Sequence, residues 1–376
     1  MNSQDFRKNH LLTILHGFDQ QNLPLDLFLM EYCRFHKALG AKDRKFIADT
    51  IYGLIRWRGL LDYLVGHDAS WEECLNFYQE FSPNDYLDKQ EIPLHIRCSF
   101  PESLFSLLVK HYGEEQAFEL ALISNTPAPT TVRVNALKTT REDLLARWKD
   151  LYQVKPCQIA PLGINFLQKI NFRALDEFRE GLFEVQDEGS QLVADEVKVK
   201  PGDTVLDFCA GAGGKALAIA PQMQQRGQLY LHDVRADALL EARKRLRRAG
   251  VQNSQVISDR APHLQKLKKS CDWVIVDTPC SGTGTLRRNP DMKWRFQAEW
   301  VTRLQGQQRV IFERALSYVK RGGRIVYATC SLLAEENEAQ AEHFARIKGL
   351  TLENTFKSLP TEGGMDGFYG VTFVKE

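Results

Sequence analysis

The chain lacks a long apolar run, because no window approaches the roughly 18 consecutive apolar residues of a membrane-spanning helix. Its start, MNSQDFRKNHLLTILHGF, has no extended apolar core and no small-residue cleavage site, which argues against a secretory signal. We therefore expect a cytoplasmic protein with no membrane partner. A chain of this size usually forms two or three domains, at roughly 100–200 residues each.

Cysteine is sparse, with eight in 376 residues, and the cysteines are scattered. No C-x-x-C pair occurs, which argues against zinc ribbons and thioredoxin-like redox sites, and we expect no metal site. A chain of this size can bury a large core without disulfides or metals. Since the default cysteine of a cytosolic protein is a small buried hydrophobe, each functional cysteine needs its own argument.

Charge is balanced overall, at +1, but not along the chain. Residues 61–120 carry 12 acidic and 3 basic side chains, whereas residues 226–320 carry 9 acidic and 19 basic ones. A polyanion would be attracted to the second region and repelled by the first. A solvated basic helix would give the same pattern, so charge alone decides nothing.

The first part of the chain has the apolar spacing of helices. In KDRKFIADTIYGLIRWRGLLDYLVG apolar residues recur at helical intervals, and further helical stretches are expected at 11–18, 25–36 and 101–122. Two prolines within 125–129 mark a linker, and the alternating TTVRVNAL then predicts a strand of a small α+β subdomain. We predict a helical domain over 1–124, a small α+β subdomain over 125–180 and a third domain over 181–376.

The third domain alternates strands with helices. Strands are predicted at 204–209, 228–234, 254–258, 272–277 and 324–329, with a last strand at 368–374. Helices are predicted between them at 212–223, 236–249 and 300–319. Strands that alternate with helices indicate an α/β fold, a parallel sheet with helices on both faces.

A glycine-rich turn follows the first of these strands, in TVLDFCAGAGGKALAIA. Gly211, Gly213 and Gly214 allow a sharp turn and close approach of a ligand, although the spacing is neither a dinucleotide fingerprint nor a P-loop. Asp233 ends the next strand, where a carboxylate can accept hydrogen bonds from both ribose hydroxyls. It could instead cap the following helix, but the spacing favours the ribose. Asp259 ends the third strand and could reach an adenine amino group, or be an ordinary turn aspartate.

Two cysteines leave the predicted sheet where strands end. DWVIVDTPCSGTG breaks at Asp277 and Cys280, and GGRIVYATCS breaks at Cys330. Since parallel strands end at the same edge of a sheet, both cysteines should lie near the glycine-rich turn. A single cysteine in such a place is more often a core residue, but two in matching positions favour a reactive site.

Methylation of a pyrimidine at carbon 5 would use this set of groups. A thiolate that adds to carbon 6 makes carbon 5 nucleophilic, and an acid near N3 neutralises the developing charge. After methyl transfer a base removes the carbon-5 proton, so that the thiolate can leave. One cysteine would be the nucleophile and the other would assist, and the residues alone do not say which. Lys215 is a candidate source of the positive charge that favours a thiolate.

At these residues the sequence resembles the Sun (RsmB-type) family of RNA cytosine-5 methyltransferases. The matching pieces are DFCAGAGGKA, LHDVRADALLEARKRLRRAGV, DTPCSGTGTLRRNPDMKW and YATCS, with FEVQDEGSQLVAD and GGMDGFYGVTF at either side. TTVRVNAL resembles the family's small (RRM-like) subdomain, and ALGAKDRKFIADTIYGLIRW resembles the helical NusB-like RNA-binding domain of bacterial members. The resemblance implies a Rossmann-like methyltransferase domain, S-adenosylmethionine as cofactor and RNA, ribosomal in bacterial relatives, as substrate. We also expect a monomer.

The resemblance assigns a role to each matching residue. Cys330, in TCS, corresponds to the nucleophile, and Cys280, in PC, to the cysteine that helps release the product. Asp277 corresponds to the aspartate beside the target base and the methyl donor. Asp233 corresponds to the ribose-binding acid and Asp259 to the residue near adenine. The cofactor loop corresponds to Cys209, Ala210, Gly211, Ala212, Gly213, Gly214 and Lys215, of which Lys215 lies near the reacting centre.

One departure lies within that loop, where many members have Ala-Pro and this chain has Gly211-Ala212. Glycine is permissive at a turn, so we expect cofactor binding to be retained.

RNA contacts are predicted from two basic stretches, because a target cytosine must be flipped or single-stranded to reach the site. One stretch comprises Arg243, Lys244, Arg245, Arg247 and Arg248. The other comprises Arg287, Arg288, Lys293 and Arg295, interleaved with Trp294, which could stack on a base or anchor a core.

Two other interpretations stay open at this point. A non-catalytic RNA-binding assembly factor on a decayed methyltransferase fold is disfavoured by the intact cysteines, Asp277 and Lys215. A different methyltransferase is disfavoured by motif, since adenine amino methylation usually carries an N/D-P-P-Y type motif where this chain has DTPC. DNA cytosine methylation would place the nucleophile at Cys280.

Overall fold

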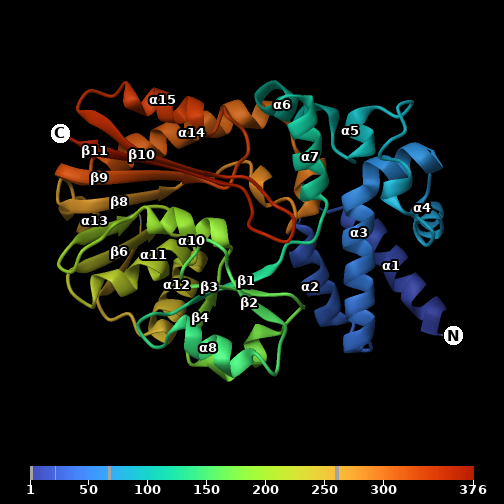
Figure 1. Cartoon of the computed structure of the whole chain (residues 1–376), viewed down its shortest axis with the longest axis horizontal. Coiled ribbons are helices and arrows are strands. Elements are labelled where there is room, and N and C mark those ends of the chain that lie inside the picture. Colours follow the sequence, from blue (N-terminus) through green and yellow to red (C-terminus); the bar gives the residue numbers. More distant parts are fainter. Residues whose placement is uncertain (1–2, 22, 67–68, 259–261) are drawn as a thin grey trace. The chain divides into compact units, whose positions relative to one another are not determined.

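The computed structural model describes residues 3–21, 23–66, 69–258 and 262–376 (Figure 1). The chain divides into two compact units. Residues 1–127 and 285–298 form a helical unit, and residues 128–284 and 299–376 form an α/β unit. Among the described residues no helix combines the length and apolarity needed to cross a membrane.

The helical unit is built around amphipathic helices, as the apolar spacing predicts. In α3, Ile47, Ile51, Leu54 and Ile55 recur at three- and four-residue intervals and are almost fully buried. The helices are α1 (Ser3–Asp19), α2 (Leu25–Phe35), α3 (Ala41–Val65), α4 (Trp71–Tyr78), α5 (Leu94–Arg97), α6 (Glu102–Tyr112) and α7 (Glu114–Ser124), with 3-10 turns η1 (Pro83–Asp85) and η5 (Pro290–Arg295).

The single helical stretch expected over 101–122 is wrong. Gly113 adopts a φ of +78°, in the left-handed region that an α-helix cannot use, and separates α6 from α7. The apolar spacing continues across the break, so hydrophobic periodicity alone did not reveal it.

A distant segment, residues 285–298, completes the helical unit. The Asp291 carboxylate accepts a hydrogen bond from the amide of Leu25, the first residue of α2, at 3.2 Å. Trp294 Nε1 donates to the Ile55 carbonyl at 2.6 Å, and its ring packs against the core of α1–α4. The segment is therefore part of the interior of this unit.

The α/β unit begins with a small antiparallel sheet in the order β2-β3-β1-β4. Its core is aromatic, with the rings of Trp148, Phe166 and Phe183 almost fully buried. The elements are β1 (Thr130–Val134), α8 (Arg141–Trp148), β2 (Val154–Pro156), β3 (Gly163–Phe166), η2 (Phe172–Ala174), α9 (Asp176–Arg179) and β4 (Phe183–Val185).

The large sheet has the order β10-β11-β9-β8-β5-β6-β7. Its strands are β5 (Thr204–Asp207), β6 (Gln228–Asp233), β7 (Ser254–Ser258), β8 (Cys271–Asp277), β9 (Val319–Thr329), β10 (Leu350–Ser358) and β11 (Phe368–Lys375). The connecting elements are α10 (Glu188–Asp195), α11 (Gly214–Ile219), η3 (Ala220–Met223), α12 (Ala236–Ala249), α13 (Pro262–Lys266), η4 (Thr283–Thr285), α14 (Ala298–Leu316) and α15 (Glu338–Ala345).

Strands β5 to β9 are parallel, as predicted, and β11 runs antiparallel to both β9 and β10. Edge strand β10 was missed, because most of LTLENTFKS is exposed and polar and shows no clear alternation.

Alternate residues of the strands face opposite helical layers. Val205 and Ile275 pack in the cluster that contains residues of α11 and α12, whereas Leu206 and Val274 pack with residues of α14 and α15. Figure 1 shows these two helix pairs on opposite sides of the sheet. Both faces are therefore covered, which explains why β5 and β8 read as nearly continuous apolar runs.

The chain leaves β5 to form β6 and β7 on one side, then returns to form β8 on the other. Strand order reverses between β5 and β8, and ligands of open α/β sheets bind outside the carboxyl ends at such a point. The topology thus predicts a ligand site outside the carboxyl ends of β5 and β8.

Candidate active site

Four neighbouring strands of the large sheet end at, or directly before, an aspartate or a cysteine. Asp207 ends β5, Asp233 ends β6 and Asp277 ends β8. Cys330 directly follows β9, whose end pairs with that of β8 so that Asp277 lies opposite Ala328. The expectation that both cysteine-bearing loops leave the same edge of the sheet is met by this register.

The glycine-rich loop joins β5 to α11 and depends on two left-handed residues. Gly211 has a φ of +52° and Gly213 a φ of +79°. A Cβ atom on Gly213 would lie 3.2 Å from Leu231 Cδ2 and 3.3 Å from Ala242 Cβ, so the position is crowded as well as left-handed. The Gly213 amide closes the turn by donating to the Ala210 carbonyl at 2.7 Å.

Asp233 ties this loop to the end of β6. Its carboxylate accepts the Gly211 amide at 2.8 Å and the Arg235 amide at 2.9 Å, and only 7% of the residue is exposed. Burial alone would raise the pKa of Asp233, but the hydrogen bonds from Arg235 and Gly211 outweigh it and hold the pKa below its usual value. Asp259, the predicted adenine contact, lies outside the described residues.

Asp207 is a site residue that the sequence reasoning missed. The residue is 1% exposed, and neither carboxylate oxygen has a hydrogen-bond partner of normal geometry among the described residues. Burial, reinforced by the charge of Asp277, raises its pKa to about 7, although Lys215 and the Ala216 amide oppose the rise. Its position one residue before the FCAGAGG loop was the available signal, but an aspartate that ends a strand is common.

Lys215, the last residue of the predicted cofactor loop, pairs with Asp277. Its ammonium lies 2.5 Å from Asp277 Oδ2, and 5% of the lysine side chain is exposed against 38% of the aspartate. The lysine that was considered as a source of positive charge for a thiolate is thus engaged by the acid that ends β8.

The two cysteines meet beyond β8 and β9. Cys280 Sγ and Cys330 Sγ lie 3.4 Å apart, both thiols are free, and both residues are partly exposed. The Gly284 amide, at the end of the Cys280 loop, donates to the Cys330 carbonyl at 2.9 Å. A backbone hydrogen bond therefore joins the two loops directly.

The contact between the two sulfur atoms affects the pKa of Cys280. The hydrogen bond to Cys330 and burial together raise the pKa of Cys280 well above its ordinary value, and the charges of Cys330 and Glu336 add to the rise. Cys280 is therefore held as a thiol, the form that donates rather than attacks.

Comparison with known proteins gives this geometry a family. Residues 195–373 match the family model of the 16S rRNA methyltransferase RsmB/F, and residues 100–173 match that of its ferredoxin-like domain. The ribosomal RNA small subunit methyltransferase B of Vibrio vulnificus is 32% identical over 330 residues, which cover 85% of this chain and 74% of that protein.

The chain belongs to the RsmB/F family. A second relative, the probable ribosomal RNA small subunit methyltransferase B of Synechocystis, is 32% identical over 262 residues, and the chain spans 59% of its length. The solved methyltransferase homologue from Pyrococcus horikoshii is 27% identical, with a TM-score of 0.65 over 79% of this chain and all of that one.

S-adenosylmethionine is the cofactor of this RsmB/F methyltransferase domain, and the residues present suit it. Asp207, Asp233 and Asp277 end the strands beside the glycine-rich loop. Buried Lys215 pairs with Asp277, and buried Arg133 donates to the Gly214 carbonyl at 3.2 Å. Three carboxylates at these strand ends, one of them buried with its pKa raised to about 7, fit a ligand that carries sulfonium and ammonium charges.

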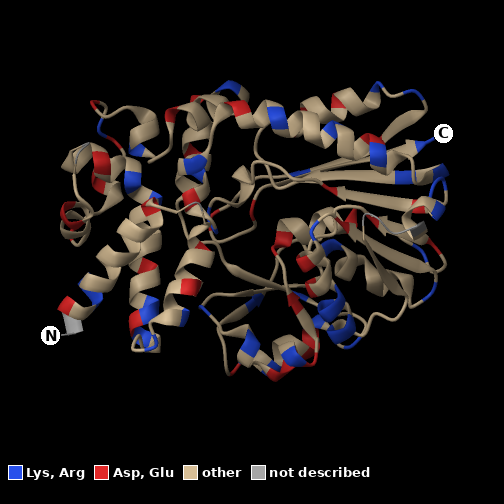
Figure 2. Ribbon diagram, turned by 180° about the vertical axis from the view of Figure 1, so that it is seen from behind, with Lys and Arg blue, Asp and Glu red and all other residues tan. Residues whose placement is uncertain are grey.

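Helix α12 carries several Lys and Arg residues (Figure 2), but not all of their side chains are exposed. Arg245 and Arg248 form ion pairs of 3.0 and 2.6 Å with buried Glu184 of β4. These two arginines are therefore engaged within the chain, and their ion pairs link the small sheet to α12. Arg243, Lys244 and Arg247 are exposed, and stay candidates.

The second basic stretch requires a larger correction. Arg287 and Lys293 are each 1% exposed, so their side chains are not available to phosphates. Lys293 donates to Asn125 Oδ1 at 2.6 Å and to the Arg56 carbonyl at 2.7 Å, and Arg287 donates to the Pro127 carbonyl at 2.9 Å. Trp294 is the core anchor and not a stacking surface. The basic residues of this segment predicted a surface location, whereas two of them, Arg287 and Lys293, are buried within the helical unit.

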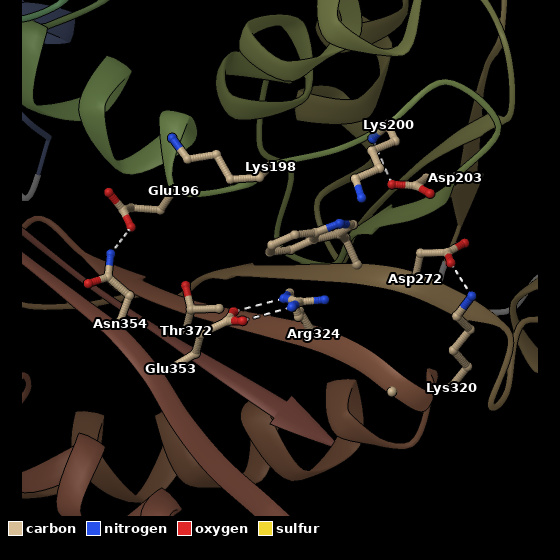
Figure 3. A pocket seen from close by; sticks show the side chains of 12 residues that line it. Glu196, Lys198, Lys200, Asp203, Asp272, Lys320, Arg324, Glu353, Asn354 and Thr372 are labelled. Carbon is tan, nitrogen blue, oxygen red and sulfur yellow. Dashed lines mark hydrogen bonds and ion pairs between the residues drawn. The ribbon is translucent and has the colours of Figure 1, made fainter. Parts of the chain in front are cut away.

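The opposite end of the sheet holds a cavity of about 480 Å³ (Figure 3). Arg324 Nη2 pairs with Glu353 at 2.7 Å, Lys320 pairs with Asp272, and Asn354 donates to Glu196. Trp273 lies under the Arg324 guanidinium and is 6% exposed. The charges of this cavity are largely matched within the chain, and it gathers none of the predicted site residues.

Proposed function

We propose that the protein methylates carbon 5 of a cytosine in small-subunit ribosomal RNA, through a covalent bond between Cys330 and carbon 6 of the base. The 3.4 Å contact between Cys280 and Cys330, on loops that follow the ends of adjacent strands, carries this proposal. The names of the relatives support the substrate class. A ribosomal substrate also suits the expected cytoplasmic location.

In the proposed reaction the Cys330 thiolate forms a bond to carbon 6, and the electron pair of the C5–C6 double bond becomes available at carbon 5. In this proposal Asp277 contacts the polar edge of the base, where an acid at N3 would neutralise the developing charge. When bound, S-adenosylmethionine would supply an electrophilic methyl group to carbon 5, with S-adenosylhomocysteine as the leaving group. Loss of the carbon-5 proton to a base then restores the double bond, and the C6–S bond breaks to return the thiolate.

Cys280 is suited to the last step because its pKa depends on the state of Cys330. While the Cys330 sulfur is free, its hydrogen bond and charge keep Cys280 protonated. Once that sulfur is bonded to carbon 6, both of these contributions disappear and the pKa of Cys280 falls. Cys280 can then take the carbon-5 proton, directly or through water, at the stage when a base is needed.

Cofactor and RNA binding use other residues in this proposal. Asp233 holds the ribose, the loop from Cys209 to Lys215 surrounds the methionine part, and Asp259 contacts the adenine. Arg243, Lys244 and Arg247 contribute the sequence-independent phosphate attraction that a flipped-base enzyme requires.

The testing experiment traps the adduct. Cys280→Ala protein is incubated with unmodified small-subunit ribosomal RNA and S-adenosylmethionine and run on a denaturing gel. We expect a protein–RNA band that resists denaturation, because formation of the Cys330 bond is retained while its release is slowed. The band should disappear in the Cys280→Ala, Cys330→Ala double variant, and sequencing of the trapped RNA would identify the cytosine.

A band that survives the loss of Cys330 but not of Cys280 would reverse the roles of the cysteines and favour the DNA-type arrangement. Absence of any band, with S-adenosylmethionine binding confirmed by calorimetry, would contradict the covalent route on this RNA. Absence of both would favour the non-catalytic assembly factor.

A further inference from the structure

A buried carboxylate, Glu336, bridges the two cysteine-bearing loops. The residue is fully buried in the turn between β9 and α15. Its carboxylate accepts the amide of Ser281, the residue after Cys280, at 2.9 Å through Oε1 and 3.2 Å through Oε2. Its Oε2 also accepts the hydroxyl of Ser331, the residue after Cys330, at 2.6 Å. One side chain thus holds the residue that follows each cysteine.

Further polar residues hold the carboxylate in place. Gln308 of α14 donates to Glu336 Oε1 at 2.9 Å and to the Pro279 carbonyl, just before Cys280, at 3.1 Å. Gln340 donates to Gln308 Oε1 at 2.9 Å. These side chains are fully buried, and a buried charge is tolerated only with such hydrogen bonding. The network connects α14 and α15 to both cysteine-bearing loops.

We propose that Glu336 is a positioning residue that clamps the Cys280 loop to the Cys330 loop and thereby sets the separation of the two sulfur atoms during release of the RNA adduct. This inference rests on the proposed function, because release of the RNA adduct is the step in which the clamp would act. Within the described residues Glu336 hydrogen-bonds to Ser281 and Ser331 and to neither sulfur, so it acts through these two serines and is not itself catalytic.

The clamp has an electrostatic consequence as well as a geometric one. A negative charge beside Cys280 disfavours a second negative charge there, and Glu336 is among the causes that raise the pKa of Cys280. The other groups that act on this thiol are Cys330, which raises its pKa, and the Gly282 backbone, which lowers it. Buried Tyr327 is also coupled to Cys280 and donates to the Glu336 carbonyl at 2.7 Å.

The first test measures the sulfur separation without RNA. Diamide oxidises the Cys280–Cys330 dithiol to a disulfide and is itself reduced to the hydrazide, and mass spectrometry of the digested protein gives the closure rate. We expect Glu336→Ala to slow closure about fivefold or more, because the sulfurs lose their fixed proximity. Glu338→Gln is the matched control, since Glu338 lies two residues away and pairs with Lys357 on β10.

The second test separates a clamp from a general loss of structure. Glu336→Gln keeps the shape and removes the charge, and the Gly284–Cys330 backbone bond remains in it. We expect the pH at which Cys280 is half-alkylated by iodoacetamide to fall in this variant, while circular dichroism is unchanged. With RNA and S-adenosylmethionine, Glu336→Gln should accumulate the denaturation-resistant adduct that the wild-type chain releases.

Wild-type closure rates and an unchanged Cys280 alkylation profile in a folded Glu336→Gln protein would overturn the clamp. If Glu336→Ala does not fold, the isosteric variant decides alone. Normal adduct formation and release in Glu336→Gln would also overturn the clamp while leaving the proposed function intact. Failure of the proposed function appears separately, as absence of adduct in Cys280→Ala.

Discussion

Both ends of the large sheet carry charged residues, but the environments of these charges differ. At the amino ends, Lys320 pairs with Asp272 and Arg324 pairs with Glu353, with much of each side chain in solvent. At the carboxyl ends, Asp207 is buried without such a partner, and Lys215 is buried against a single acid. Matched surface charges add little to stability or reactivity, whereas buried, unevenly matched ones shift pKa values and attract ligands. The difference supports the proposal that the carboxyl ends of the strands hold the active site.

The largest expected effect contrasts two cysteines. Cys330→Ala should lower turnover by at least about 10⁴-fold, as loss of an activated nucleophile does in other enzymes. Cys271→Ala, at the amino end of β8, should keep turnover near wild type, because Cys271 is a fully buried core residue there. Single-turnover methyl transfer from labelled S-adenosylmethionine measures both. Comparable losses in the two variants would mean that the assay reports folding and not chemistry.

The next contrast concerns pH and stability. Asp207 has a pKa raised to about 7, above its unfolded value, so its ionisation costs stability increasingly as the pH rises towards 7. The free energy of unfolding of Asp207→Asn, relative to that of the wild type, should therefore increase by about 2 kcal/mol as the pH rises from 5 to 8.

Asp272, at the amino end of β8, should behave in the opposite way. Burial alone would raise its pKa, but hydrogen bonds from Lys320 and the Thr204 amide hold it below the usual value. Its stabilisation is present above the unfolded pKa and is lost as the pH falls. Asp272→Asn should thus be most damaging near neutral pH. Urea unfolding at several pH values measures both, and parallel pH profiles would remove the contrast.

Breaking one ion pair at each end gives a smaller difference. Asp277→Asn leaves buried Lys215 without its partner and should cost about 2 kcal/mol of unfolding free energy, less than a fully buried pair because Asp277 is partly exposed. Glu353→Gln leaves solvated Arg324 and should cost less than about 1 kcal/mol. Both are carboxylate-to-amide changes, and equal costs in urea titrations would show that burial does not govern the difference.

The smallest expected effect concerns cofactor affinity. Asp233→Ala should weaken S-adenosylmethionine binding about tenfold or more, because charge-assisted hydrogen bonds are lost, with little change in RNA binding. Asp203→Ala, which precedes β5 at the amino end, should leave that affinity unchanged. Titration calorimetry measures both, and equal affinity in wild type and Asp233→Ala would remove Asp233 from the proposed site.

The strands could be predicted because they follow local rules. Apolar runs that stop at or near Asp233 and Asp277 indicate buried strands, and the parallel topology brings their ends to one edge. The run before the glycine-rich loop continues past Asp207 to Cys209, so the end of β5 was not predicted. The antiparallel strand β10 could not be found in this way, since an exposed edge strand needs no apolar alternation.

The supporting residues of the site were not predictable, for a different reason. Glu336 and Gln308 look like surface residues in the sequence and are fully buried only because several loops converge on them. The same holds for Arg287 and Lys293, whose partners lie more than 150 residues away along the chain. Charge in a sequence indicates surface unless tertiary contacts supply a partner, and no local pattern reports those contacts.

Residues 285–298 link the evolutionary fates of the two units. They belong to the helical unit, yet they begin one residue after Gly284, which bonds to the Cys330 carbonyl. A gene that lost the codons for residues 1–127 would leave Arg287, Lys293 and Trp294 without their hydrogen-bond acceptors and with newly exposed apolar surface. Loss or exchange of the helical unit would therefore also require changes in residues 285–298, which lie between two parts of the α/β unit in the sequence. The two units are thus hard to exchange independently of each other during evolution.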